Sequence, residues 1–312
     1  MMRLLDKSLI LVTGKGGVGK STVAAALGRA AVAAGHRTMV CEVSSQARMA
    51  TLLGGADAGT GAVGEERELE PGLWTVTIDP DDALKAWLAN QLGSRPLVNI
   101  LTRSNLFSYF VAAAPGAREL VTMTRVWEMA QVKRWDKRSQ RYDVVIADLP
   151  ASGHALGMMR APKTFLDIAR IGPIASQAGQ VTKSLADPGQ AAIVAVTLPG
   201  ELPVSETLEL EGRTVAALGR GLDLIVANDV FTKRWTAADA GALADGGAVE
   251  GRIAGAAARE AARTAVQQRQ LRRLRDGATV PVLALGHLTA PSLGPPQITE
   301  LSEQLAGKLA KL

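Results

Sequence analysis

The sequence is poor in cysteine and in long apolar runs. Its 312 residues include a single cysteine, Cys41, which excludes an internal disulfide and leaves no cysteine pair to bind a metal. Cys41 ends an apolar stretch, so we expect it to be buried. No span of 18 residues is apolar and free of charge, which excludes a membrane-spanning helix. Nothing before the first apolar run resembles a signal peptide, and we expect a cytoplasmic location.

The chain also lacks internal repeats and a strong charge bias. A net charge of +5, with 47% hydrophobic and 21% charged residues, is typical of a soluble globular protein, and the length fits one large domain over 1–312. Arginines concentrate in residues 252–275. Such a run can contact nucleic acid or an acidic lipid surface, but we favour the solvated face of a helix and expect no nucleic-acid partner.

The most informative feature present is a glycine-rich stretch at residues 14–22, which reads GKGGVGKST. It follows the apolar run 9–12 and precedes an alanine-rich segment, the strand–loop–helix context of a phosphate-binding loop. Glycines let backbone N–H groups and the helix N-terminus point at phosphate oxygens. We expect Lys20 to reach the β- and γ-phosphates and Ser21 to hold Mg²⁺. The predicted nucleotide-binding residues of the loop are Gly14, Lys15, Gly16, Gly17, Val18, Gly19, Lys20, Ser21 and Thr22.

Short apolar runs alternate with alanine- and leucine-rich segments along much of the chain. The runs show little polar alternation, which is typical of parallel strands covered on both faces. We therefore predict an α/β fold with a doubly wound, mainly parallel sheet. The glycine-rich segment 54–72 is predicted to be an exposed connection. The predicted strands are 8–12, 38–42, 144–148, 192–197, 224–228 and 280–285.

Two segments interrupt this alternation, at about 82–136 and 164–186. Neither carries a strand signal, and we expect them to form a helical subdomain on the loop side of the sheet. Apolar residues in the first segment can line a groove for a client or form the core of the subdomain. These residues are Leu97, Ile100, Leu101, Leu106, Phe107, Phe110, Val111 and Met123.

A second motif, which contains an acidic residue, follows the phosphate loop along the chain. Asp148 closes the apolar run 144–148, as the magnesium-binding aspartate of a Walker B strand does. We expect it to hold Mg²⁺ through a water molecule. Both metal ligands predicted from the sequence are thus oxygen donors, Ser21 and Asp148.

The loop sequence, with Lys15 directly after its first glycine, resembles the deviant Walker A group of nucleotide hydrolases. This group includes MinD/ParA positioning ATPases, nitrogenase iron protein, arsenite-pump ATPases (ArsA) and ATPases that target tail-anchored membrane proteins. In these families the extra lysine reaches the nucleotide of a dimer partner. The resemblance therefore implies ATP-dependent dimerisation through Lys15, and the alternative is a solvated lysine beside the anion site.

Other segments narrow the resemblance to the ArsA and tail-anchored-targeting ATPases. Residues 148–154 are similar to their switch, which implies that Pro150, Gly153 and His154 sense the γ-phosphate; His154 can instead be a structural histidine. Asn228 matches the asparagine that contacts adenine. Segments 77–84, 114–119 and 198–210 also match, so MinD/ParA ATPases are a poorer match.

The chain departs from this pattern in three ways. A single cysteine argues against metalloid transport, and the Cys-x-x-Cys pair of the zinc-clamped dimers is absent, so we expect no zinc. Ser44 stands where an aspartate is expected to orient the attacking water. Glu42 is the candidate substitute, and without one we expect slow hydrolysis, because catalysis here is mostly positioning and charge stabilisation.

These features predict a dimeric ATPase that uses ATP and Mg²⁺ to control an apolar client, such as a membrane-protein segment. Its partner is an identical chain or a paralogue. The alternatives are a positioning or scaffold ATPase, with peripheral membrane contact, or a weakly active partner subunit. A membrane contact would use residues 297–312, whose apolar side chains recur at helical spacing. We favour packing on the sheet for these residues, which are Ile298, Leu301, Leu305, Leu309 and Leu312.

Overall fold

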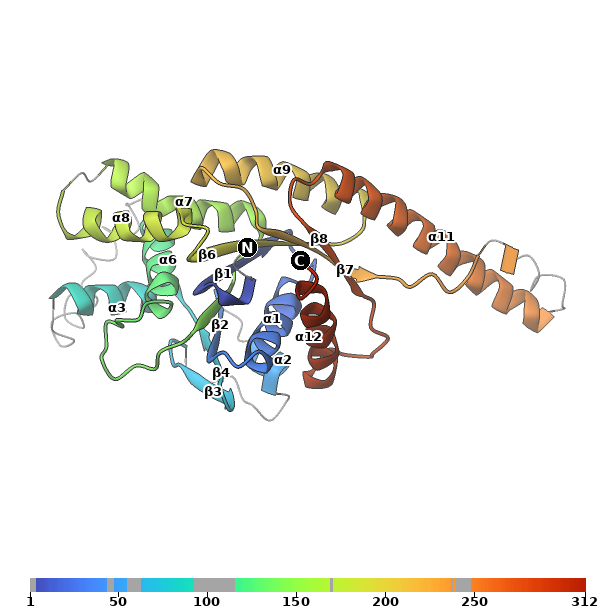
Figure 1. Ribbon diagram of the computed structural model, residues 1–312, viewed down its shortest axis with the longest axis horizontal. Coiled ribbons are helices and arrows are strands. Elements are labelled where there is room, and N and C mark those ends of the chain that lie inside the picture. Colours follow the sequence, from blue (N-terminus) through green and yellow to red (C-terminus); the bar gives the residue numbers. More distant parts are fainter. Residues whose placement is uncertain are drawn as a thin grey trace.

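The structure is a computed structural model that describes residues 4–43, 48–54, 63–92, 116–168, 171–236, 238–239 and 248–312. Its centre is an eight-stranded sheet with the strand order β3-β4-β2-β5-β1-β6-β7-β8 (Figure 1). Only β3 and β4 pair in antiparallel fashion; the other neighbours are parallel. The strands are β1 (Leu9–Gly14), β2 (Thr38–Glu42), β3 (Arg67–Glu70), β4 (Leu73–Thr77), β5 (Val144–Asp148), β6 (Ala191–Thr197), β7 (Leu224–Val230) and β8 (Val282–Gly286).

Helices cover both faces of the sheet, which confirms the predicted α/β class (Figure 1). One face carries α1 (Lys20–Ala33), α2 (Met49–Gly54) and α12 (Pro295–Leu309). The opposite face carries α3 (Pro80–Leu92), α6 (Ala117–Met129), α7 (Ser152–Ile168), α8 (Pro173–Ala186) and α9 (Glu201–Leu218). The long helix α11 (Ala248–Gly277) packs on α9 and extends past the edge of the sheet.

The six strands predicted from apolar runs are all present, with small shifts at their ends. The predicted exposed connection 54–72 was wrong in part, because residues 67–70 form the edge strand β3. This strand reads RELE and is only half-buried, so it carries no apolar pattern. Pairing with the better-buried β4 supplies the backbone hydrogen bonds that make it a strand.

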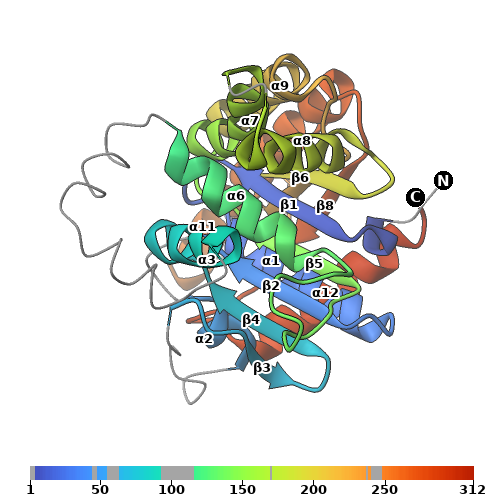
Figure 2. The same ribbon diagram turned by 90° about the vertical axis from the view of Figure 1, so that its left-hand side faces the viewer.

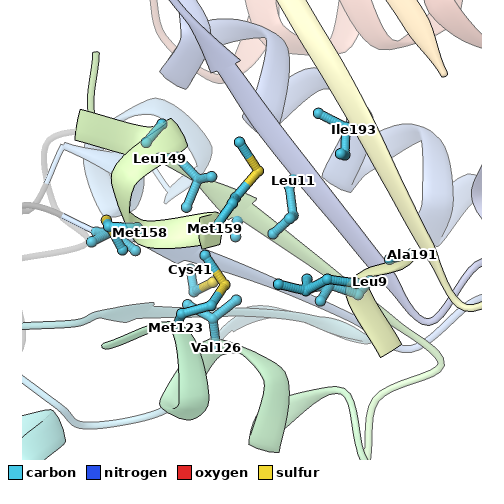
Figure 3. Packing of buried hydrophobic residues seen from close by; sticks show 14 of the residues in the cluster. Leu9, Leu11, Cys41, Met123, Val126, Leu149, Met158, Met159, Ala191 and Ile193 are labelled. Carbon is cyan, nitrogen blue, oxygen red and sulfur yellow. The ribbon is translucent and has the colours of Figure 1, made fainter. Parts of the chain in front are cut away.

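The main core lies between the sheet and α6 and α7 (Figure 3). Leu9 and Leu11 of β1 face Met123 of α6 and Met159 of α7, all nearly free of solvent contact. Cys41 is fully buried in the same cluster, as predicted, and burial raises the pKa of its thiol. Met123 is therefore a core residue, and the other proposed groove residues, 97–111, lie outside the described part of the chain.

The arginine-rich run 252–275 forms most of α11. All seven of its arginines are exposed, whereas Leu271 and Leu274 are buried against the core. The run is thus the solvated face of a helix, as predicted. No helix among the described residues has the length and apolarity needed to cross a membrane.

The C-terminal helix α12 packs against α1 and the sheet (Figure 2). Ile298, Leu301 and Leu305 are at most 3% exposed and belong to the core beneath this face. Most of the apolar stripe therefore faces the protein, with Leu309 partly buried and Leu312 exposed beyond the end of the helix, which confirms the favoured interpretation. The proposed membrane contact loses its main support.

We expect Leu305→Ala to destabilise the fold by about 2–5 kcal/mol, because it leaves a cavity in a fully buried site. Leu312→Ala is the matched control, since this leucine is 60% exposed. Urea unfolding of both variants measures the difference. Equal stability of the two variants would mean that α12 is not docked in solution.

Candidate functional site

The glycine-rich loop lies at the carboxyl end of β1 and leads into α1. Gly14 and Gly19 have backbone φ angles of 145° and 89°, which residues other than glycine rarely adopt. A Cβ on Gly14 would lie 2.2 Å from the carbonyl oxygen of Val196, and one on Gly19 would lie 2.2 Å from Nδ2 of Asn228. Glycine at these two positions therefore lets the loop approach the ends of β6 and β7.

The loop is anchored in the core on one side and open on the other. Val18 and Thr22 are buried, whereas a Cβ on Gly16 or Gly17 would meet nothing within 4 Å. The open backbone is accessible to a phosphate chain, as a phosphate-binding loop requires.

Lys20, the first residue of α1, folds back over the loop. Its Nζ donates to the carbonyl oxygen of Lys15 at 3.0 Å. Burial lowers the pKa of the Lys20 ammonium, and the nearby charge of Asp148 opposes this shift. A phosphate group would give this half-buried ammonium a charged hydrogen-bond acceptor, which none of the described residues supplies.

Ser21 and Asp148 come together although 127 positions separate them, because β5 lies beside β1 in the sheet. Ser21 Oγ donates a short hydrogen bond to Oδ2 of Asp148. Oδ1 of Asp148 is buried and has no hydrogen-bond partner among the described residues. A hydroxyl and a carboxylate with a free oxygen fit Mg²⁺, which prefers oxygen ligands and keeps several waters.

The environment of Asp148 disfavours its charge. Burial raises the pKa of this carboxyl to about 6, with a smaller contribution from the charge of Glu42, while the Ser21 hydrogen bond acts in the opposite direction. A bound cation would reverse this shift, since a positive charge favours the carboxylate.

Glu42 ends β2 and pairs in register with Asp148. It is buried, and its Oε2 accepts the backbone N–H groups of Arg48 and Met49 at 2.7 and 3.1 Å. Glu42 thus fixes the start of α2. Its role in orienting water stays a prediction, and Ser44 lies outside the described residues.

Lys15 forms an ion pair with Glu206 of α9, with 2.7 Å between Nζ and Oε1. Both side chains remain more than a third exposed, so the pair can exchange for another partner. Glu206 lies in the segment 198–210 that matched the family pattern, but the sequence assigned it no contact with Lys15, because only the fold brings α9 beside the loop. A contact of Lys15 across a dimer stays a prediction.

Asn228 holds the phosphate loop from the end of β7, where its Nδ2 donates to the carbonyl oxygen of Val18 at 3.1 Å. The adenine contact expected of it stays a prediction. Beside it, Nδ1 of His287 lies 2.6 Å from Oδ1 of Asp229. Sequence reasoning missed this pair, since 58 positions separate the two residues.

The predicted switch residues follow β5 and open α7. Pro150 is half-buried, whereas Gly153 and His154 are exposed. The His154 backbone N–H donates to the carbonyl oxygen of Ala151, which starts the helix. The segment therefore joins Asp148 directly to a helix that packs on α6, α8 and α9.

Comparison with known proteins decides the family. The sequence model described as anion-transporting ATPase matches residues 7–171, just over half of the chain and including the loop and Asp148. The chain belongs to this family. The resemblance inferred from the motifs is thereby confirmed.

Several proteins similar to this member of the anion-transporting ATPase family are themselves named as ATPases. The chain is 32% identical over 212 residues to ATPase BagA of Mycobacterium tuberculosis, a match that covers 66% of this chain and 61% of BagA. It is 24% identical over 263 residues to an ATPase ASNA1 homolog of Entamoeba dispar, covering 71% of this chain and 76% of that protein. ATPase ARSA1 of Chlamydomonas reinhardtii is 23% identical over 180 residues, covering 50% of this chain and 22% of ARSA1.

Proposed function

We propose that this chain binds ATP with Mg²⁺ and hydrolyses it. The observation that carries the proposal is the contact between Ser21 and Asp148 beside Lys20, with one buried carboxylate oxygen left without a partner among the described residues. The family and the ATPase names of its relatives support the same reaction. Phosphate release from ATP, with and without Mg²⁺, tests it directly.

Each element of the site has a task in this reaction. The open loop backbone binds the phosphate chain, and Lys20 stabilises the charge that develops on the γ-phosphate. Ser21 and Asp148 hold the metal ion, which neutralises phosphate charge when bound. The remaining task is to orient the attacking water, for which Glu42 is the candidate.

We further propose that ATP binding joins two subunits, either two copies of this chain or this chain and a paralogue. We also propose that the closure of the dimer changes how it holds an apolar client. The exposed Lys15–Glu206 pair at the loop supports the first part, because a weak surface pair can be exchanged for a phosphate of the partner. The second part is supported by α7, which starts at the predicted switch and packs on α6 and α8.

We expect Lys15→Ala to keep ATP affinity in the monomer within a few-fold of the wild type but to suppress dimerisation by ATP. Sedimentation velocity with and without ATP and Mg²⁺ measures this. Lys163→Ala is the matched control, because Lys163 also forms an exposed ion pair, with Asp167 of the same helix. A dimer of unchanged ATP dependence in Lys15→Ala would contradict the role across the interface.

We expect the chain alone to bind Mg·ATP well but to hydrolyse it more slowly than about once per second, a slow rate for an enzyme. The expected cause is Ser44 in place of a carboxylate. Ser44→Asp should then raise the steady-state rate of phosphate release without changing ATP affinity. Fast turnover of the unmodified chain would mean that Glu42, or another group, already positions the water.

A further inference from the structure

Strand β7 contains a β-bulge at Asn228. Between two paired positions the chain passes from Ala227 to Val230 on β7, which is three steps. On the neighbouring β8 it passes from Ala284 to Gly286, which is two steps, so β7 holds one extra residue. Ala227 and Val230 consequently belong to the same core, whereas regular alternation would place them on opposite faces of the sheet. The bulge therefore shapes the end of β7 that meets the phosphate loop.

Asp229, the residue after Asn228 in this bulge, has a left-handed backbone with a φ angle of 61°. Among the residues that the structure describes, it is the only one other than glycine with a positive φ. Aspartate tolerates this region better than most residues, but the conformation still costs free energy that surrounding contacts must offset. Such backbone strain is typical of functional sites.

Two side chains from outside β7 hold the bulge in place. Nδ1 of His287, which directly follows β8, lies 2.6 Å from Oδ1 of Asp229, and the His287 N–H donates to the carbonyl oxygen of Val230 at 2.9 Å. Gln267 of α11 binds the backbone on both sides of Val230. Its Nε2 donates to the carbonyl oxygen of Asp229 at 3.1 Å, and its Oε1 accepts the N–H of Phe231 at 2.7 Å. The bulge is thus tied to both β8 and α11.

Phe231 extends the same cluster. The centroid of its ring lies 4.5 Å from that of the His287 ring, and the guanidinium carbon of Arg263 lies 4.7 Å from the Phe231 centroid. Ring and cation contacts of this kind add stability. The pair of His287 and Asp229 is weak by itself, because these side chains are 35% and 47% exposed. The contacts therefore hold the bulge jointly.

Asn228 connects this cluster to the phosphate loop. Its Nδ2 donates to the carbonyl oxygen of Val18 at 3.1 Å, and a Cβ on Gly19 would lie 2.2 Å from the same nitrogen. Within the described part of the chain, neither His287 nor Gln267 forms a hydrogen bond with the loop. Their influence on the loop therefore passes through Asn228.

We propose that His287 and Gln267 are positioning residues for the nucleotide. By holding Asp229 in its left-handed conformation, they keep Asn228 against the phosphate loop. The loop is then preorganised, and less free energy is spent on ordering it when phosphate binds. This role rests on the proposed binding of ATP at the loop. It adds that β8 and α11 set the nucleotide affinity without touching the loop.

Isothermal titration of Mg·ADP into the full chain tests this role, because ADP is not consumed during the measurement. We expect His287→Ala to weaken binding about 3- to 10-fold, through loss of the partly exposed pair and of the ring contact. His287→Asn restores an N–H donor near the position of Nδ1, so it should bind ADP about 2-fold or more tightly than His287→Ala. Equal affinities of these two variants would contradict a role for the contact with Asp229.

Two further variants complete the series. Gln267→Ala removes two hydrogen bonds to the bulge, and we expect it to weaken ADP binding about 3- to 10-fold. His36→Ala is the matched control for the histidine, because His36 is half-buried and precedes β2, at the opposite end of the sheet from the loop. His36→Ala should bind ADP as the wild type does.

A double-mutant cycle with Asn228→Ala tests the route. If His287 acts through Asn228, adding His287→Ala to Asn228→Ala should change ADP affinity by less than about 2-fold, because the positioned group is already absent. A merely structural effect of His287, or a direct contact with the nucleotide, would instead lower affinity by the same factor in both backgrounds. Additive losses would therefore overturn the proposed role.

Thermal unfolding without nucleotide shows which variants are folded at the titration temperature. Gln267→Ala lies on a different element from His287, so it stays informative if the histidine variants do not fold. Failure of the wild type to bind either ADP or ATP would contradict the proposed function, and this role with it. Wild-type affinity in folded His287→Ala and Gln267→Ala, with ADP bound by the wild type, would overturn the positioning role alone.

Discussion

Lys20→Ala is expected to abolish measurable ATP binding. The ammonium of Lys20 is half-buried against the loop, where its hydrogen bond to the Lys15 carbonyl holds it beside the expected phosphate position. Each hydrogen bond between a charged donor and a phosphate contributes about 1.5–3 kcal/mol, and Lys20 can reach two phosphates. The expected loss is therefore about 100-fold or more in affinity, measured by isothermal titration calorimetry.

The same variant should fold normally. Burial lowers the pKa of Lys20, which means that the fold disfavours its charge and gains little from it without nucleotide. Thermal unfolding without ATP checks this, with Lys163→Ala as a surface control. If folded Lys20→Ala binds ATP within a few-fold of the wild type, the loop is not the phosphate site.

The sequence predicted the parts of the fold that depend on contiguous apolar runs. The six buried strands are such runs, because parallel strands covered on both faces contain few polar side chains. The edge strand β3 was missed for the converse reason: its pattern is polar, and it exists through pairing with β4. Residues 44–47 and 93–115 lie outside the described chain, so the predicted boundaries of the helical subdomain stay a prediction.

The residues of the candidate site likewise include some that the sequence predicts and some that only the fold reveals. The phosphate loop and Asp148 are visible in the sequence, because each is a short motif at the end of an apolar strand. His287 carries no such motif, and Glu206 lies in the matched segment 198–210 without an assigned role. Glu206 meets Lys15 only because α9 packs beside the loop, and His287 meets Asp229 only because β8 lies beside β7. Contacts of this kind depend on tertiary packing, which one sequence does not reveal.

Asp148→Asn is expected to stabilise the nucleotide-free protein while it removes ATP hydrolysis. The pKa of the Asp148 carboxyl is raised from its ordinary value of 3.8 to about 6 in the fold, chiefly by burial. Between these values the folded state binds more protons than the unfolded state, so stability falls as the pH rises. Above pH 6 the carboxyl is ionised in both states, and the folded state carries the full free-energy cost of the buried charge. A rise of about two units in the pKa corresponds to a loss of about 3 kcal/mol in the free energy of unfolding.

Asparagine carries no charge at any of these pH values and can still hydrogen-bond Ser21, so the variant escapes this penalty. Urea unfolding in EDTA should therefore show a gain of up to about 3 kcal/mol at pH 8 that shrinks toward zero near pH 4. Asp276→Asn, at an exposed position, should change stability by less than about 0.5 kcal/mol at either pH. A gain that does not depend on pH, or a loss at pH 8, would mean that Asp148 is not held in a charge-disfavouring site. Phosphate release by the same variant should fall about 100-fold or more, because the carboxylate that positions Mg²⁺ is gone.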